Sequence, residues 1–157
     1  MRAYPEAMPE AGSATLCNCQ ALRQAARRVS AFYDVALADS GLRISQYAVL
    51  ARLRADGPRG IQALADALAM DRTTLGRALR PLERDGLVRL ARDPADARQR
   101  RLILTEQGRE RLDRARPAWA TAQARFEQGF GVERAAQLRA DLAGAATAAA
   151  TILDPAR

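Results

Sequence analysis

Arginine and threonine side chains are spaced through the segment MDRTTLGRALRPLERDGLV, residues 70–88. Guanidinium groups bind phosphate oxygens and guanine edges, and a threonine hydroxyl bonds a base or a phosphate. In a helix of about 100° per residue, the leucines and the alanine of this segment form a single apolar stripe. The opposite side, which holds no acid, carries Thr73, Arg77, Arg80 and Arg84. The spacing therefore predicts a helix that packs on a core and presents cations to a polyanion.

A solvated charged face is the ordinary alternative for such a helix. A short helix and one tight turn precede it, however, and that arrangement places a recognition helix in the major groove. Asp71 can cap the helix by accepting from its first amides. Pro81 lacks an amide for the carbonyl four residues earlier, so we expect a bend in the second half. We hypothesise that residues 72–77 lie in the groove and that Arg80 and Arg84 meet the DNA backbone.

The composition limits the classes of partner. A chain of 157 residues is long enough for one domain with a sizeable core, and abundant alanine and leucine favour helices. A formal charge of +7 and a pI of about 10.8 point to nucleic acid or a membrane surface. All 25 basic residues are arginine, so a single arginine counts only at a meaningful position. No apolar run approaches the roughly 20 residues of a membrane span, and residues 1–15 are expected to be a flexible tail without a signal peptide.

Histidine is absent and the acids form no cluster with metal-ligand spacing, which excludes histidine-based zinc sites and hydrolytic triads. We expect no cofactor. The two cysteines, Cys17 and Cys19, fit a reducing cytoplasm. On a helix their side chains would diverge by roughly 200°, so a bridge between them is not expected. Cys19 is the one plausible nucleophile, and without a histidine base an enzyme is the least favoured class.

Hydrophobic periodicity and breaker residues divide the chain into helices and two strands. Helical patterns cover Leu16–Ala38, the run QYAVLARLRA with Ser45 as its cap, the short IQALADALA, the 71–86 segment and two stretches after Glu106. Strand-like runs, LVRLAR and RRLILT, flank the polar DPADARQ. Two short helices with a tight turn and a following hairpin make a winged helix-turn-helix. The predicted fold class is mainly α with a small β-hairpin wing.

The hairpin turn carries Arg98, Arg100 and Arg101 close to its tip. A wing tip reaches the minor groove, where an arginine senses narrow A·T-rich DNA. Asp96, two residues before Arg98, is expected to pair with that guanidinium and to fix its direction. A loop of mixed charge is usually only solvated, but one that directly follows a recognition helix is placed to touch DNA.

Two stretches, LADALAMDRTTLGRALRPLERDGLVRL and the wing RDPADARQRRLILTEQG, resemble the MarR family of bacterial transcription regulators. The wing has a D-x-R at Asp96–Arg98 and an L-T-x-x-G at Leu104–Gly108, both typical of that family. The resemblance extends from about Cys17 to the C-terminus. The combination of helix-turn-helix and wing is fairly specific, so the family provides a further set of expectations.

The resemblance implies a single MarR-like domain over residues 16–157. Its DNA-binding winged helix-turn-helix would be residues 45–105, and helices in 16–40 and 106–153 would join two subunits as a homodimer. Such a protein binds a palindromic operator in double-stranded DNA as a repressor, and a small molecule or oxidation releases it. The long flanking helices agree with a dimer, because they have more apolar surface than one wing domain covers.

Carried over position by position, the resemblance makes Arg98 the minor-groove arginine, and Thr73, Thr74 and Arg77 major-groove contacts. Together with the argument from the helical face, it gives one predicted DNA-binding set. The set is Arg72, Thr73, Thr74, Arg77, Arg80, Arg84, Asp96, Arg98 and Arg100.

The signal that releases the protein is expected to be a small aromatic or phenolic molecule. The rings that would line a cleft between the DNA module and the dimerisation helices are Phe32, Tyr33, Tyr47 and Trp119. Some of these rings have an ordinary alternative role in the core. A regulator without a ligand and an architectural DNA-binding protein without sequence preference also stay open.

A thiol-based sensor of organic peroxides is a further alternative. The stretch CNCQALRQAARRVSAFYD is similar to the one that carries the reactive cysteine in the organic-hydroperoxide-sensing branch of the family. Cys19 falls on the peroxidatic position, and Tyr33 on a tyrosine that acts from the other subunit. Within one helix these two would lie about 21 Å apart, so the sensor needs a dimer. Arg23 and Ile44 stand where that branch has further tyrosines, and both cysteines have an alternative role as small packing residues.

Overall fold

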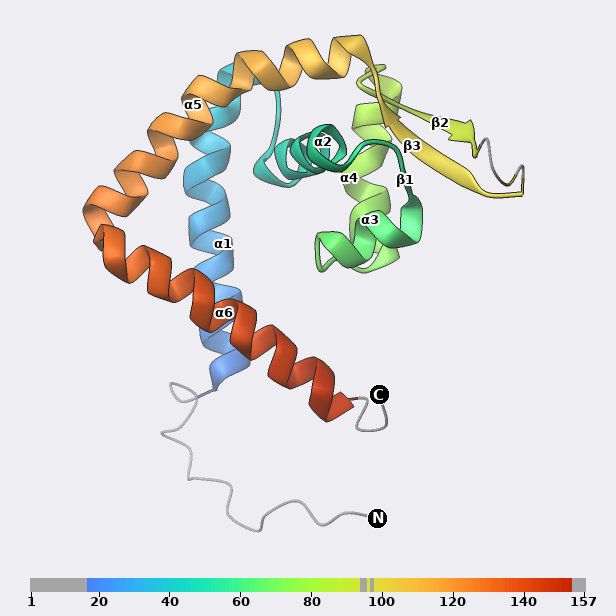
Figure 1. Ribbon diagram of the computed structural model, residues 1–157. Helices are drawn as coiled ribbons and strands as arrows, with labels where there is room; N and C mark the ends of the chain where they lie inside the picture. The colour runs from blue at the N-terminus through green and yellow to red at the C-terminus, as the bar shows by residue number, and fades with distance from the viewer. Residues whose placement is uncertain (1–16, 94–95, 97, 154–157) are drawn as a thin grey trace. The chain divides into compact units, whose positions relative to one another are not determined.

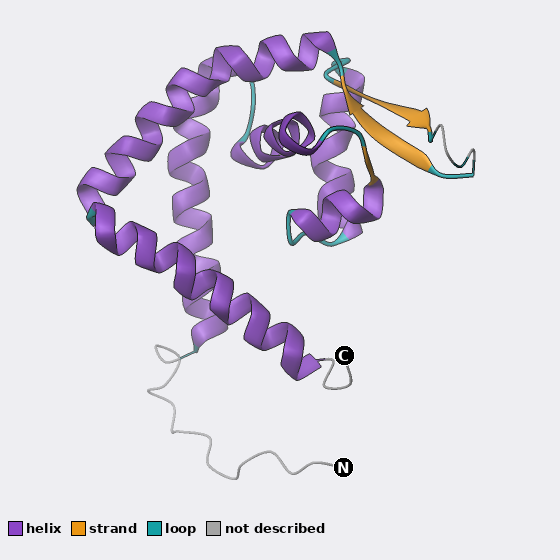
Figure 2. Cartoon of the chain, in the orientation of Figure 1, coloured by secondary structure: helices purple, strands orange, loops and turns teal. Residues whose placement is uncertain are grey.

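The computed structural model describes residues 17–93, 96 and 98–153 (Figures 1 and 2). The predicted tail at residues 1–15 lies outside this range. The chain divides into two compact units, Met1–Ala115 and Arg116–Arg157, and each is described by itself. The first unit contains a small sheet and most of the helices, and the second is helical.

Helices and strands follow one another in the predicted order, so the winged helix-turn-helix and the mainly α fold class are confirmed. The helices of the first unit are α1 (Asn18–Leu37), the 3₁₀ turn η2 (Ala38–Ser40), α2 (Ile44–Asp56), α3 (Ile61–Ala67), α4 (Arg72–Arg84) and the first part of α5 (Glu106–Phe130). Its strands are β1 (Arg59–Gly60), β2 (Val88–Arg92) and β3 (Arg100–Leu104). The remainder of α5 and α6 (Val132–Leu153) belong to the second unit.

The core of the first unit lies where α2, α3 and α4 meet the sheet. Leu64 of α3, Leu50 of α2 and Leu102 of β3 are fully buried there. Burial of one such side chain stabilises the fold by about 1.5–3 kcal/mol. α4 contributes the apolar stripe that its periodicity predicts, which consists of Leu75, Ala78, Leu79 and Leu82. The opposite side of α4 is therefore left facing outward.

The sheet has three antiparallel strands in the order β1-β3-β2. In the hairpin Val88 stands opposite Leu104, and Leu90 stands opposite Leu102. The two hairpin strands were expected from the sequence, but β1 was not. It consists of two residues that pair with Leu102 and Arg101 of β3, and a strand that short has no visible alternation.

The start of α2 differs from the sequence expectation that Ser45 caps it. The helix begins at Ile44, two residues before the predicted start at Gln46, so its N-cap is Arg43 and Ser45 lies inside it. The amide of Ile44 donates to Oδ1 of Asp34 on α1 at 2.7 Å, and the amide of Arg43 donates to Oε1 of Gln46 at 2.8 Å. Because Asp34 of α1 accepts from the amide of Ile44 and Gln46 of α2 accepts from that of Arg43, no serine cap is needed.

Hydrogen bonds connect the start of α5 to the turn that follows α4. The hydroxyl of Thr105 lies 2.7 Å from the carbonyl oxygen of Gly86 and 3.0 Å from that of Leu87, and it accepts from the amide of Gly108 at 3.0 Å. A Cβ atom at Gly108 would stand 2.1 Å from the oxygen of Leu87, which no side chain tolerates. The L-T-x-x-G motif is thus the set of residues that seats α5 on the α4–β2 turn.

The second unit is built around the turn from α5 to α6. Gly131 adopts a φ of +99° between the two helices, a conformation that favours glycine. Glu127 accepts from Gln123 at 2.8 Å and from Arg139 of α6 at 3.0 Å, and these two contacts, in that order, lower the pKa of its carboxyl. The guanidinium of Arg134 lies 4.6 Å from the ring centre of Phe130. These contacts fix the reversal of the chain.

Large apolar side chains are exposed on helices of both units. On α6 they are Val132, Leu142, Ile152 and Leu153, and on α1 they are Leu22 and Val35. No helix within the described part of the chain combines the length and the apolar character that a membrane crossing requires.

Candidate nucleic-acid interface

A tight turn joins α3 to α4. The amide of Met70 donates to the carbonyl of Ala65 at 2.9 Å, and Ala69 adopts a φ of +49°. Ala69 is the one non-glycine residue with a positive φ among those described. Such a left-handed conformation costs an L-residue roughly 1–2 kcal/mol. The turn therefore contains strain at the point where it places α4.

Asp71 caps α4, as the sequence predicts. Its Oδ1 accepts from the amide of Thr74 at 2.8 Å, and its Oδ2 accepts from the hydroxyl of the same residue at 2.6 Å. The hydroxyl bond and then the amide bond of Thr74 lower the pKa of the Asp71 carboxyl. The hydroxyl proton of Thr74 is thereby used, so this side chain can meet DNA only as an acceptor or through its methyl group.

The outer face of α4 carries the predicted cations and is exposed. We use this name for Thr73, Arg77, Arg80 and Arg84. No ion pair among the described residues involves Arg77 or Arg80, or the neighbouring Arg72. Pro81 lies inside the helix, which continues to Arg84, and the predicted bend stays a prediction. The face can thus present uncompensated guanidinium groups to phosphate or guanine.

Arg84 differs from the other cations of the outer face. Its Nε donates to Oδ1 of Asp85 at 2.8 Å. This bond and the charge of Asp85 raise the pKa of Arg84, and the bond to Arg84 lowers the pKa of Asp85. The pair is exposed, so it contributes little to stability. Asp85 therefore compensates part of the charge that Arg84 can present to a DNA phosphate.

The wing tip is organised by Asp96. Its Oδ1 accepts from the backbone amide of Arg98 at 3.0 Å, its Oδ2 accepts from Nε2 of Gln99 at 3.1 Å, and its carbonyl accepts from the amide of Gln99. The sequence led us to expect an ion pair between Asp96 and the guanidinium of Arg98. The carboxylate instead binds the backbone, because an Asx turn brings the amide two residues ahead within reach. The Arg98 side chain is exposed, at the tip that Asp96 shapes.

A buried carboxylate that the sequence did not indicate lies where β2 ends and the turn of the wing begins. Asp93 is 6% exposed and forms an ion pair with Arg101. Its amide also donates to the carbonyl of Gln99 at 2.9 Å, which closes the hairpin. Arg101 lies near the turn, as expected, one pair before the turn end of the ladder, and its side chain is held by Asp93. The sequence RDPADARQRR alone does not show that Asp93 pairs with Arg101, because this contact depends on the register of the hairpin.

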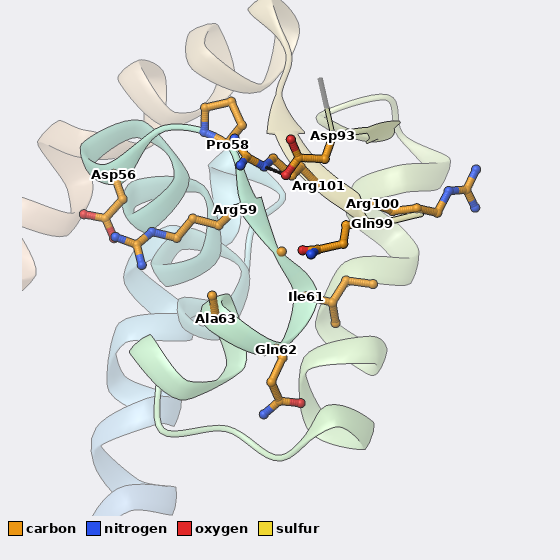
Figure 3. A pocket seen from close by; sticks show the side chains of 11 residues that line it. Asp56, Pro58, Arg59, Ile61, Gln62, Ala63, Asp93, Gln99, Arg100 and Arg101 are labelled. Carbon is orange, nitrogen blue, oxygen red and sulfur yellow. Dashed lines mark ion pairs between the residues drawn. The ribbon is translucent and has the colours of Figure 1, made fainter. Parts of the chain in front are cut away.

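A cavity of about 670 Å³ lies beside the ion pair of Asp93 and Arg101 (Figure 3). Its lining comes from the end of α2, from β1, from the first residues of α3 and from the start of β3. Arg59 pairs with Asp56 at 3.0 Å on one side of it, and Arg101 pairs with Asp93 on the other. Gln62 and Arg100 also line the cavity. Its wall is therefore polar and carries both signs of charge.

The aromatic residues proposed for an effector cleft do not line this cavity or a second one of about 380 Å³ at the junction of α1 and α2. Tyr33 and Tyr47 are buried, and Phe32 contacts Tyr33 edge-to-face with the ring centres 5.3 Å apart. Trp119 belongs to the second unit. A cleft formed by these rings stays a prediction.

Both thiols are exposed, with Cys17 at the N-cap of α1 and Cys19 in its first turn. No cluster of three or more acidic, histidine or cysteine side chains suited to a metal ion exists within the described ranges.

The geometry of the interface can be compared with known proteins. The family model that matches, over residues 42–99, is that of the MarR family. The transcriptional regulator HosA of Escherichia coli O111:H- is 41% identical over 98 residues, which are 61% of this chain and 70% of HosA. The chain spans about half the length of two further curated relatives, 58% of one and 47% of the other.

Solved structures show the same fold. The transcriptional regulator MosR of M. tuberculosis in complex with DNA is 38% identical, with a TM-score of 0.73 over 85% of this chain and 98% of MosR. The transcriptional repressor CouR bound to a 23-mer DNA duplex is 30% identical, with a TM-score of 0.75 over 89% of this chain and 99% of CouR. CouR has also been solved with p-coumaroyl-CoA, at 28% identity. With its capped outer helix, its wing and these similarities, this chain belongs to the MarR family, whose members are transcription regulators and not enzymes.

Proposed function

We propose that this protein is a sequence-specific transcription regulator that binds a palindromic operator in double-stranded DNA as a homodimer and represses transcription. The observation that carries the proposal is the outer face of α4, which is exposed, presents arginines without an ion pair and begins at a capped N-terminus. The complexes of MosR and CouR with DNA support it.

In the proposed complex the first turns of α4 enter the major groove. Thr73 and Arg77 point outward from these turns, and the fork of a guanidinium matches the O6 and N7 acceptors of guanine. Arg80 and Arg84 lie farther along the helix and meet phosphates of the backbone. Arg98 extends from the Asp96 turn into the adjacent minor groove. Two grooves would thus be read by elements that one core holds.

The apolar side chains exposed on α1 and α6 support a homodimer. On α6 alone, Ile152 and Leu153 are neighbours and are 79% and 85% exposed, and Val35 of α1 is 78% exposed; a partner chain would cover them. A twofold dimer presents two identical recognition helices, so its operator has the same symmetry. We infer repression because CouR, whose fold is shared, is a repressor. A protein that acts on the chromosome works in the cytoplasm.

The effector that we propose is a small aromatic or phenolic molecule. The complex of CouR with p-coumaroyl-CoA supports this class of ligand, since its acyl group carries a phenol ring. The rings of Phe32, Tyr33, Tyr47 and Trp119 are the candidates for the ligand cleft in the assembled dimer. An organic peroxide is the second candidate signal, because the thiol of Cys19 is exposed and open to oxidation.

A gel-shift experiment on duplexes selected by the protein from a random library tests this function. The proposal expects a palindromic consensus and a loss of affinity of at least a thousandfold when the consensus is scrambled. Equal affinity for the scrambled duplex would identify an architectural DNA-binding protein instead. Adding a panel of phenolic acids, and separately cumene hydroperoxide, distinguishes the two signals. Release by peroxide in wild type but not in Cys19→Ser, with no effect of the acids, would overturn the aromatic effector.

A further inference from the structure

Two arginines stand directly opposite each other in the stem of the wing, which is our name for the paired strands β2 and β3. They form the last pair before the turn. The register of the hairpin pairs Arg92 of β2 with Arg100 of β3, and both side chains are exposed. Directly opposite residues of an antiparallel pair share a face of the sheet, with Cβ atoms about 4.5–5.5 Å apart. Like charges in that position repel each other and weaken the hairpin. The molecule therefore contains a repulsive pair that its own fold does not require.

The face that carries this pair is the one that continues the core. Val88, Leu102 and Leu104 lie on it and are buried, and the arginines occupy the next outward position of the same face. β2 contacts α4, and β3 contacts α2 and α3. The two guanidinium groups thus extend from the side of the hairpin that faces the helices, beyond the last buried leucine.

Neither arginine is neutralised by an acid of the described residues. The nearest carboxylate along the chain, that of Asp93, forms its ion pair with Arg101 on the other face of the hairpin. Figure 3 shows Arg100 pointing away from that pair. Arg100 also lines the wall of the 670 Å³ cavity, together with Gln62 of α3. The acids of the same wall, Asp56 and Asp93, are paired with Arg59 and Arg101. An anion that approaches here therefore meets the cation of Arg100, with Arg92 opposite it in the hairpin.

We propose that Arg92 and Arg100 form a clamp for one phosphodiester of the DNA backbone. This inference rests on the proposed function, and it assigns a phosphate site rather than a base contact. When α4 lies in a major groove and the wing tip lies in the neighbouring minor groove, one backbone strand runs between the two grooves. That strand crosses the stem of the wing. Its phosphate supplies the negative charge that relieves the repulsion between the two guanidinium groups.

Neutral phosphate analogues test the clamp directly. Each phosphate of a selected duplex is replaced in turn by a methylphosphonate, and affinity is measured for wild type and for Arg92→Ala/Arg100→Ala. One replacement in each half-site should weaken wild type about tenfold and leave the double variant unchanged, because the partner charge has already been removed. The double variant should also reduce the slope of log affinity against log salt by about 1 for each half-site.

Arg89→Ala is the matched control. Arg89 is an exposed arginine on the same strand, but it pairs with Ile103 and faces the other side of the hairpin. It should show the wild-type pattern of sensitivity to methylphosphonate. A clamp that is merely structural would lower the thermal stability of the double variant, whereas the repulsion predicts an unchanged or higher Tm at low salt without DNA.

The outcomes separate the clamp from the function on which it rests. If wild type selects a duplex but every methylphosphonate weakens wild type and double variant by the same factor, the clamp is overturned and the function stands. If wild type selects no duplex, both fall. Sodium phosphate, compared with sodium chloride at equal ionic strength, tests the free anion. Greater stabilisation of wild type than of the double variant, without coupling in the duplex, would mean a site for free phosphate and would overturn the DNA assignment.

Discussion

The outer face of α4 and the wing both present arginines, but the fold holds them by different means. On α4, helical periodicity alone separates the cations from the buried leucines, and no ion pair among the described residues involves Arg77 or Arg80. On the wing, carboxylates decide which cations remain available. Asp93 forms an ion pair with Arg101, and Asp96 accepts a hydrogen bond from the backbone amide of Arg98 at the tip. A helix can therefore display charge by spacing, whereas a hairpin must select it through register and turn contacts.

If the wing acts through one selected cation, Arg98→Ala should have the largest effect. The loss of a specific minor-groove contact weakens operator binding by roughly 1–3 kcal/mol. Titration of a labelled duplex at fixed salt measures it. Asp96→Ala is the companion variant and should lose less affinity in the same direction, because the arginine remains but the turn bonds to it and to Gln99 are gone. Wild-type affinity in both variants would show that the wing does not read DNA.

The two ends of the outer face of α4 should differ from each other. Arg77→Ala should cost about 1–2 kcal/mol on the best duplex and reduce discrimination between operator variants, since it removes a base contact. Arg84→Ala should weaken all duplexes alike and by less, because Asp85 already compensates part of its charge. Competition assays with single-base variants measure both. A change of base preference in Arg84→Ala alone would reverse the groove and backbone assignments.

The comparison also explains what the sequence could predict. The stripe of Leu75, Leu79 and Leu82 and the cap at Asp71 are local, because residues within four positions define them. The cap of α2 is not local: its acceptor, Asp34, lies ten positions before Ile44 on another helix. The sequence alone therefore indicates Ser45 as the cap, whereas Ser45 lies inside α2.

The wing was predicted as a hairpin but not in its contacts. Turn residues and alternation identify two strands, but not which residues stand opposite each other. The pairing of Arg92 with Arg100 and the ion pair of Asp93 with Arg101 both depend on that register. The sequence predicted that Asp96 pairs with the guanidinium of Arg98, but the structure shows its carboxylate accepting from the backbone amide of Arg98.

The cap of α4 should matter for stability in a pH-dependent way. The pKa of Asp71 is lowered in the folded state from its ordinary value of 3.8, first by the hydroxyl and then by the amide of Thr74. Its contribution is therefore present above pH 3.8 and is lost as the pH falls through the lower folded value. Asp71→Ala should reduce the Tm at pH 7 by roughly 3–6 °C.

Asp71→Asn is the control for this prediction, because it keeps an acceptor for the Thr74 amide but cannot titrate. Its Tm at pH 7 should lie slightly below that of wild type, and the difference should be smaller at pH 3, because protonation then removes part of the charge of Asp71. Thermal unfolding followed by circular dichroism at both pH values makes the comparison. An equal difference at both values would show that the charge of Asp71 has no part in the cap.

The turn that places α4 should yield the smallest effect, and one of the opposite sign. Ala69 adopts a φ of +49°, which costs alanine roughly 1–2 kcal/mol and costs glycine almost nothing. Glycine loses more entropy on folding, so Ala69→Gly should stabilise the protein by about 0.5–1 kcal/mol. Ala63→Gly, at an exposed position inside α3, should destabilise it by about 1 kcal/mol, because an ordinary helical φ gives glycine no advantage. Urea unfolding measures both variants.

Because the substitution keeps the turn and touches no outward side chain, Ala69→Gly should bind its duplex with wild-type affinity. A stabilised variant with weakened binding would mean that the strain itself, and not only the geometry of the turn, sets how α4 meets DNA.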